Sequence, residues 1–244
     1  MFRASLYTAL AAGLLVLAGS GRAEENPVTG FVDKVYKGPD GQESRYVVFV
    51  PRSYSGDKEY PVILFLHGAG EKGTEGKKQV GTGLGKHIRG HEKDFEFIAV
   101  FPQAKQTWSA KSADGKQAVA ILDEVMKEYK TDKKHVYLTG LSMGGFGTWS
   151  LAAEYPDRWA AIAPICGGGD PRSAEKIKDV PCWCFHGDAD PTVKVERSRD
   201  MIKALKDAGG DPKYTEYPGV GHNSWDKAYA TKELYDWMLT HKRK

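Results

Sequence analysis

The pentapeptide Gly-Leu-Ser-Met-Gly at residues 140–144 constrains the fold of this chain more than any other feature. It directly follows an apolar run at residues 136–138. The Gly-x-Ser-x-Gly spacing is typical of a sharp strand-to-helix turn that exposes a serine hydroxyl at the end of a sheet. Cβ atoms at Gly140 and Gly144 would crowd the flanking strand and helix. The pattern therefore predicts a strand, a strained turn at Ser142 and a helix.

Apolar, β-branched runs alternate with segments of helical period along the rest of the chain. This alternation is typical of α/β proteins with a mostly parallel sheet covered by helices on both faces. The predicted strands are 45–50, 62–66, 97–101, 136–139, 160–165, 182–186 and 214–217. Helices are predicted at 114–129, at 193–208, and at the C-terminus with a start at Asn223 or Ser224, and a short helix fits 79–89. We expect one catalytic domain, residues 24–244, because 244 residues suffice for one sizeable core.

Residues 1–23 have the composition of a secretory signal peptide. Arg3 precedes an apolar run at 6–17, and small residues follow up to Ala23. The alternative is a membrane anchor, but the apolar run is shorter than the roughly 20 residues that a spanning helix needs. We therefore expect export with cleavage near Ala23, a secreted or periplasmic location, and no stable membrane insertion after cleavage.

The charges are mixed along the chain and form no basic cluster. The formal net charge is +3, and removal of residues 1–23 takes away two arginines and no acidic residue, which leaves +1. A nucleic-acid-binding protein is expected to gather its lysines and arginines on one face. We therefore expect no nucleic-acid partner, and the pattern leaves the oligomeric state open.

The three cysteines, Cys166, Cys182 and Cys184, do not form a disulfide framework, because their number is odd and two of them share one predicted strand. Buried free thiols are favoured, since free cysteine is commonly buried. One bridge from Cys166 to either of the others is the alternative that export would allow. The spacing lacks the second ligand pair of a zinc site, so we expect no metal.

Ser142 predicts a histidine and a carboxylate later in the chain, because a serine hydroxyl is a weak nucleophile until a base takes its proton. In this type of site the order along the chain is Ser, Asp or Glu, His. Asp190 and His222 have this order, and each follows a predicted strand, at the edge where sites in open parallel sheets lie. Asp188 competes with Asp190 and would otherwise shape the turn. Asp190 is favoured, because it lies further into the loop and precedes a proline.

The oxyanion of an acyl-transfer intermediate needs hydrogen-bond donors. One is expected to be the backbone N–H of Met143, and the other comes from the loop after an early strand. The Ala69 N–H is the first choice there and Gly70 the second, with a plain glycine turn as the alternative. His67 and His186 each precede a glycine at a strand end, and we expect both to be structural.

Five segments together resemble a known family: residues 65–74, 140–145, 164–169, 186–191 and 221–225. They resemble secreted, compact α/β-hydrolases of the carboxylesterase and dienelactone-hydrolase-like group. That group includes polyhydroxybutyrate-depolymerase-like and feruloyl-esterase-like proteins, some of them labelled predicted peptidases. The resemblance implies an α/β-hydrolase fold with Ser142 as nucleophile, Asp190 as orienting acid and His222 as base.

A serine carboxylic-ester hydrolase that acts through an acyl-enzyme, with no cofactor, is therefore the favoured function. An exported or polymer-linked ester is the expected substrate, such as an acetyl or feruloyl carbohydrate ester. The alternatives are a serine peptidase of the prolyl-oligopeptidase-like type and a secreted binding module with an inactive hydrolase fold.

Only residues 167–180 separate the fifth predicted strand and its cysteine from the sixth, so we expect no large lid over the site. An open site can accept a bulky or polymeric substrate. Trp108 and Trp225 are the expected flanking platforms, with Gly70 also near the bound substrate. Core packing is the alternative role of both tryptophans.

Overall fold

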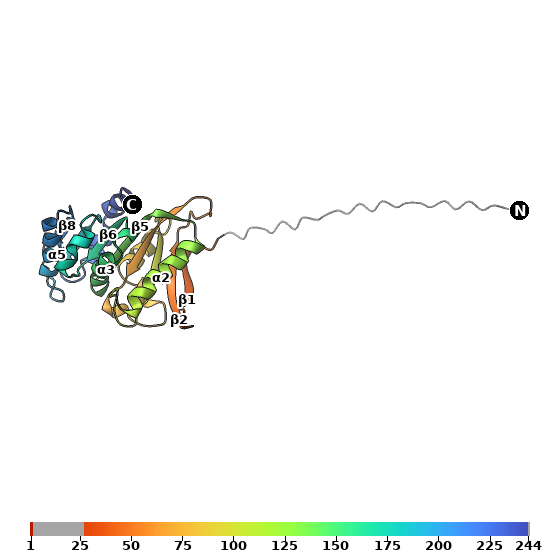
Figure 1. Cartoon of the computed structure of the whole chain (residues 1–244), viewed down its shortest axis with the longest axis horizontal. Coiled ribbons are helices and arrows are strands. Elements are labelled where there is room, and N and C mark those ends of the chain that lie inside the picture. Colours follow the sequence, from red (N-terminus) through yellow and green to blue (C-terminus); the bar gives the residue numbers. More distant parts are fainter. Residues whose placement is uncertain (2–26, 244) are drawn as a thin grey trace.

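The computed structural model describes Met1 and residues 27–243 (Figure 1). The predicted signal peptide, residues 1–23, lies outside the described residues except for Met1. Within the described part of the chain, no helix has both the length and the apolar character that crossing a membrane requires.

One eight-stranded sheet forms the centre of the molecule, in the order β1-β2-β4-β3-β5-β6-β7-β8. The pairs β1–β2 and β2–β4 are antiparallel, and all other neighbours are parallel. This confirms the prediction of a mostly parallel sheet, with β1 and β2 at one end and β8 at the other (Figure 1). The strands are β1 Gly30–Lys37, β2 Glu43–Val50, β3 Tyr60–Leu66, β4 Ile98–Pro102, β5 Thr131–Leu141, β6 Ala161–Ile165, β7 Trp183–Gly187 and β8 Lys213–Tyr217.

Helices cover both faces of the sheet. The apolar side chains of a central strand alternate between the two faces, so each face needs helices to bury them. Val62 and Leu64 of β3 belong to the cluster that contains buried side chains of α2, α3, α4 and α5, whereas Ile63 and Phe65 belong to the one with those of α1, α6 and α7. The helices are α1 Leu84–His91, α2 Ala113–Glu128, α3 Met143–Glu154, α4 Ala174–Ile177, α5 Glu196–Asp207, α6 Trp225–Ala230 and α7 Lys232–Leu239. Short 3-10 turns are η1 Ala69–Glu71, η2 Lys78–Val80, η3 Pro156–Arg158 and η4 Pro171–Ser173.

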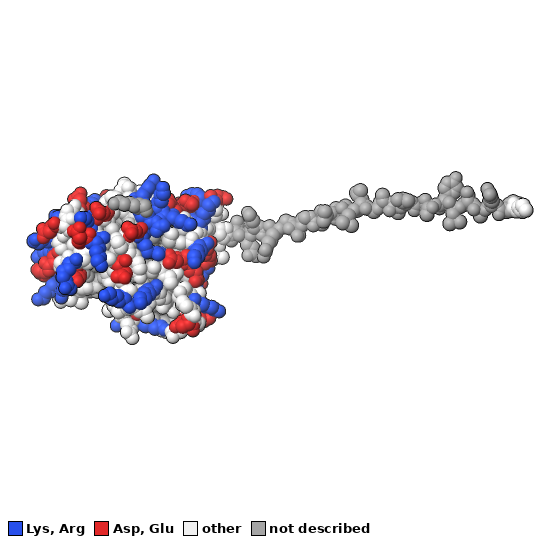
Figure 2. Space-filling view, viewed as in Figure 1, with Lys and Arg blue, Asp and Glu red and all other residues white. Residues whose placement is uncertain are grey.

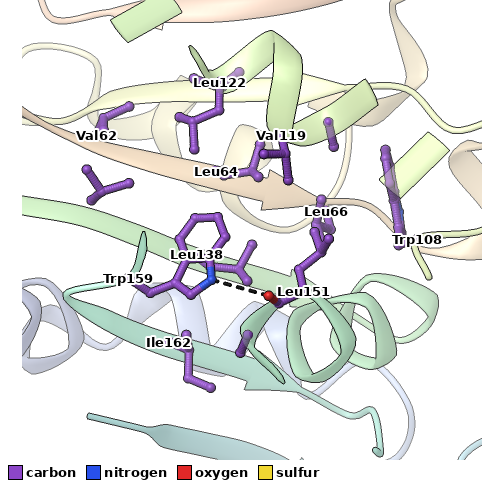
Figure 3. Close-up of a cluster of buried hydrophobic side chains, with 14 of the residues drawn as sticks. Val62, Leu64, Leu66, Trp108, Val119, Leu122, Leu138, Leu151, Trp159 and Ile162 are labelled. Carbon is purple, nitrogen blue, oxygen red and sulfur yellow. Dashed lines mark hydrogen bonds between the residues drawn. The ribbon is translucent and has the colours of Figure 1, made fainter. Parts of the chain in front are cut away.

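The core on the α2 and α3 face is continuous across three neighbouring parallel strands (Figure 3). Leu64, Leu138 and Ile162 come from β3, β5 and β6, and all are fully buried. Trp159 closes one side of this cluster, and its indole N–H donates to the carbonyl oxygen of Leu151 on α3 at 3.4 Å. This packing holds α3, and therefore the residue that precedes it, against the sheet.

Two features differ from the sequence prediction. Strand β1 was not predicted, because it is an edge strand in which Gly30 alone is buried and three residues are exposed. The single C-terminal helix is in fact two, α6 and α7, since Thr231 between them has an extended backbone (φ −77°, ψ 103°). Ser224 does precede α6, but its side chain makes no capping hydrogen bond.

The connection between β6 and β7 is short, as predicted. Residues 166–182 contain only η4 and the four-residue α4 as helical elements. Within the described part of the chain, this connection therefore places no large lid over the carboxyl edge of the sheet near Ser142. The three cysteines are buried free thiols, which is the favoured prediction rather than the single bridge.

Candidate active site

Ser142 lies on the strained turn that the sequence predicts between β5 and α3. Its φ is 52° and its ψ −116°, a backbone conformation that residues other than glycine rarely adopt. A Cβ at Gly144 would lie 1.8 Å from the carbonyl oxygen of Leu66, and one at Gly140 would lie 2.4 Å from that of Gly144. The backbone N–H of Ser142 donates to the carbonyl of Ile165 on β6 at 3.0 Å. Close backbone packing and this hydrogen bond therefore hold the serine in its strained conformation.

The structure brings Ser142, His222 and Asp190 together in one line of hydrogen bonds. His222 Nε2 lies 2.9 Å from Ser142 Oγ, and His222 Nδ1 lies 2.7 Å from Asp190 Oδ2. Because the carboxylate can only accept, Nδ1 carries the proton and Nε2 is left to accept the serine hydroxyl. This is the arrangement in which a histidine can act as base toward the serine.

The carboxylate of Asp190 is buried, yet it is held in its ionised form. Oδ1 accepts the backbone N–H groups of Thr192 at 2.8 Å and Val193 at 2.9 Å. Burial acts to raise the pKa of Asp190, but the hydrogen bonds from His222, Val193 and Thr192 outweigh it and lower that pKa. The competing Asp188 is exposed, and its Oδ1 accepts the Gly219 N–H at 2.7 Å. It therefore shapes the turn.

The loop after β3 passes beside the serine. A Cβ at Gly68 would lie 3.7 Å from Ser142 Cβ. Ala69 begins η1 and Met143 begins α3, and among the described residues nothing accepts a hydrogen bond from either backbone N–H. Gly70 is exposed on the same loop. Both expected donors therefore lie in segments next to Ser142 with their N–H groups uncommitted.

The buried ring of His67 holds this loop in place through two backbone contacts. Its ring is fully buried, with Nδ1 2.6 Å from the Gly68 carbonyl oxygen and Nε2 accepting the Ala104 N–H at 3.0 Å. Burial lowers the pKa of His67 to about 4, so the ring is neutral near pH 7. These contacts give His67 the structural role that its position predicts.

Trp108 cannot act as a substrate platform, because its side chain is only 1% exposed. Its indole N–H donates to the His67 carbonyl at 2.9 Å, and its ring packs in the apolar cluster beside Leu66 (Figure 3). The prediction of a platform was therefore wrong for Trp108, and core packing is its role. Trp225 is partly buried, and its ring meets the His222 ring edge-on with centroids 5.2 Å apart. A substrate contact of Trp225 stays a prediction.

The sequence analysis missed Phe146. This side chain is 39% exposed, one helical turn after Ser142 on α3. It lines a cavity of about 750 Å³ that opens at Ser142 and follows α3 to Glu154. The loop at 107–111 and residues 168–176 form the cavity walls. The spacing of four residues from the serine could have identified Phe146, since positions i and i+4 share one face of a helix.

Cys166 lies against the same site. Among the described residues, its Sγ, an Asp190 carboxylate oxygen and a His222 ring nitrogen form a group within 4.8 Å of one another. Burial raises the pKa of the Cys166 thiol to about 12, so the thiol is protonated near neutral pH.

Comparison with known proteins places this chain in a family. The model of the dienelactone hydrolase family matches residues 42–233. The chain belongs to the dienelactone hydrolase family. This family member is 29% identical over 177 residues to a bifunctional acetylxylan esterase/xylanase from Neocallimastix patriciarum, over 70% of this chain and 25% of that protein. The chain spans 25% and 40% of the length of two curated relatives that it matches.

Solved structures agree with this assignment. A thermostable esterase superposes on this dienelactone hydrolase family member with a TM-score of 0.81 and 36% identity, over 87% of this chain and 63% of that one. A feruloyl esterase module from Clostridium thermocellum, solved with sinapinate, has a TM-score of 0.64 at 21% identity, over 85% and 86%. The second likeness concerns the fold alone. The family resemblance and the α/β-hydrolase fold predicted from the sequence are confirmed.

Proposed function

We propose that this protein is a serine carboxylic-ester hydrolase with Ser142, His222 and Asp190 as its catalytic triad. The observation that carries the proposal is the pair of hydrogen bonds, 2.9 Å and 2.7 Å long, that joins the three side chains in the order the chemistry needs. The esterases among the relatives and structural neighbours support the reaction class.

In the proposed reaction, His222 Nε2 takes the proton of Ser142 Oγ as this oxygen attacks the ester carbonyl. Asp190 stabilises the imidazolium that forms, and the N–H groups of Met143 and Ala69 donate to the oxyanion. His222 then gives the proton to the leaving alcohol, which leaves an acyl group on Ser142. A water molecule, deprotonated by His222, attacks this acyl-enzyme. The acyl–Oγ bond then breaks, His222 returns the proton to Ser142 Oγ, and the acid is released. Protons balance in this cycle without a cofactor.

The substrate we propose is an ester with a bulky alcohol or acyl arm, such as a carbohydrate-linked acetyl or feruloyl ester. The cavity along α3 supports this size, and Phe146 supplies an apolar surface next to the serine. Lys111, Glu154 and Lys176 add polar groups to its lining. Export to the periplasm or the medium is part of the proposal and rests on the composition of residues 1–23.

The test compares the protein with Ser142→Ala on 4-nitrophenyl acetate, on a feruloyl sugar ester and on an aminoacyl-proline anilide. We expect ester hydrolysis that falls at least about a thousandfold in the variant, because the nucleophile is gone. Equal rates in both proteins would overturn the esterase assignment. Anilide hydrolysis faster than ester hydrolysis would indicate a peptidase, and absence of labelling by a fluorophosphonate would indicate a binding module.

The role of Phe146 is tested with Phe146→Ala and Phe146→Leu on the same esters. We expect KM for the feruloyl ester to rise by about threefold to tenfold in the alanine variant, since roughly 1 kcal/mol of aromatic contact is lost. 4-Nitrophenyl acetate lacks the feruloyl ring, so its KM should rise less than that of the feruloyl ester. Equal effects on both esters would contradict a substrate contact at Phe146.

A further inference from the structure

Two histidines, not one, lie against the Asp190 carboxylate. His186, in β7, has a fully buried side chain, and its Nε2 lies 3.2 Å from Asp190 Oδ2. This is the same oxygen that receives His222 Nδ1 at 2.7 Å. His186 Nε2 also lies 2.9 Å from the carbonyl oxygen of Val193. The acid of the triad therefore has a second imidazole against the oxygen that accepts from His222.

The position of the proton on His186 follows from its neighbours. Both partners of Nε2, an ionised carboxylate and a backbone carbonyl, can only accept, so Nε2 must carry a hydrogen. The other ring nitrogen, Nδ1, lies 2.7 Å from Ser198 Oγ, which also lies 3.1 Å from the Gly167 carbonyl oxygen. The Ser198 hydroxyl either donates to Nδ1 or accepts from it and donates to Gly167. In both cases the Nε2–H of His186 is shared between the Val193 carbonyl at 2.9 Å and Asp190 Oδ2 at 3.2 Å.

The Ser198 contact connects this histidine back to the nucleophile. A Cβ at Gly167 would lie 2.6 Å from the backbone nitrogen of Phe146, so the backbones at 145–146 and 167 touch in the first turn of α3. The contacts therefore form a closed ring from Ser142 through His222, Asp190, His186, Ser198 and Gly167 to α3. His222 and Ser142 are the partly exposed members of this ring, and its other members are buried.

We propose that His186 is a positioning residue of the triad. Its Nε2–H and His222 Nδ1–H divide one oxygen of Asp190, while the N–H groups of Thr192 and Val193 hold the other. Four donors leave the carboxylate one orientation. That orientation keeps the His222 proton on Nδ1 and Nε2 directed at Ser142. The inference rests on the proposed function, because it concerns how the same triad is held.

The decisive variants are His186→Leu, His186→Asn and His186→Gln. A glutamine places its amide nitrogen close to the position of imidazole Nε2 and can still donate to Asp190, whereas asparagine reaches only the Nδ1 position. We expect kcat to fall tenfold to a hundredfold in the leucine and asparagine variants, about the cost of a misplaced catalytic group. KM should change less than about threefold, and glutamine should restore kcat to within about threefold of the wild type. His135→Gln is the matched control, because His135 lies in the first half of β5, away from the end that precedes Ser142.

A double-mutant cycle separates positioning from general loss of structure. If His186 acts through Asp190, His186→Leu should cost less than about twofold in kcat once Asp190→Asn is present. Equal costs in both backgrounds would overturn the inference. If His186→Leu does not fold, Ser198→Ala is measured in its place with the same cycle. This variant removes the contact between Ser198 Oγ and His186 Nδ1 and leaves the imidazole in place.

The two proposals fail differently. Activity that survives Ser142→Ala would overturn the proposed function. An inactive Ser142→Ala variant beside fully active, folded His186→Leu and His186→Asn variants would overturn only the role of His186.

Discussion

Two histidine–glycine pairs stand at the carboxyl ends of buried strands and differ in what they hold. His67-Gly68 follows β3, and His186-Gly187 ends β7. Both rings are fully buried. Both ring nitrogens of His67 meet backbone groups, of Gly68 and Ala104. His186 meets the side chains of Asp190 and Ser198 as well as one backbone carbonyl.

The difference shows that the same local pattern can organise either side of a site. On the β3 side the histidine fixes a backbone loop, whose N–H groups are the proposed oxyanion donors. On the β7 side it holds a carboxylate. What lies across from the ring, and not the dipeptide itself, decides the role. Both contrasting side chains are buried, and on the face shown in Figure 2 basic and acidic residues are interspersed.

The largest effect is expected from breaking the β7 side at its carboxylate. Asp190→Asn keeps the shape of the side chain but removes the charge and favours the wrong tautomer of His222, which should lower kcat by about 10⁴-fold. Asp188→Asn is the matched control. Among the described residues the Asp188 carboxylate accepts only the Gly219 N–H, so this variant should keep kcat within about twofold of the wild type. Steady-state kinetics on one ester measures kcat for both variants. Comparable losses of kcat in the two variants would contradict the assignment of Asp190 as the acid.

The β3 side is broken by removing a backbone donor. Ala69→Pro deletes the N–H, and proline is tolerated there because the residue opens η1 and Gly68 before it is extended (φ −78°, ψ 178°). We expect kcat to fall by about 10² to 10³-fold, the usual cost of one oxyanion donor. Ala69→Gly retains the N–H and is the control. An unchanged kcat in a folded proline variant would exclude Ala69 as donor.

The smallest expected effect is on stability against acid and belongs to His67. Its pKa is about 4 in the folded protein and 6.5 ordinarily, so between these pH values only the unfolded chain binds the proton. The free energy of unfolding therefore decreases as pH falls from 6.5 to 4, by at most about 3 kcal/mol from this group. Urea unfolding at pH 7 and pH 4.5 measures it. In His67→Gln the free energy of unfolding should lose this part of its pH dependence. The same change of unfolding free energy with pH in the variant would contradict a lowered pKa of buried His67.

Much of the site follows from local rules of sequence. Gly140 and Gly144 identify the turn, because any Cβ there meets backbone atoms. The order of Ser142, Asp190 and His222 after successive strands was sufficient to propose the triad, and the structure brings these side chains into contact. Strand β1 escaped prediction because an edge strand buries too few residues to produce an apolar run.

The sequence by itself determined the alternation of strands and helices, the strained turn and the short β6–β7 connection, because each depends on sterics and periodicity within a few residues. Only the tertiary structure decided that Trp108 is core, that other segments leave a cavity beside Phe146 and that His186 shares Asp190 with His222. These outcomes depend on which atoms lie across a gap from residues far away in the chain. The burial of a side chain and the position of a proton depend on these distant atoms, which no local sequence pattern specifies.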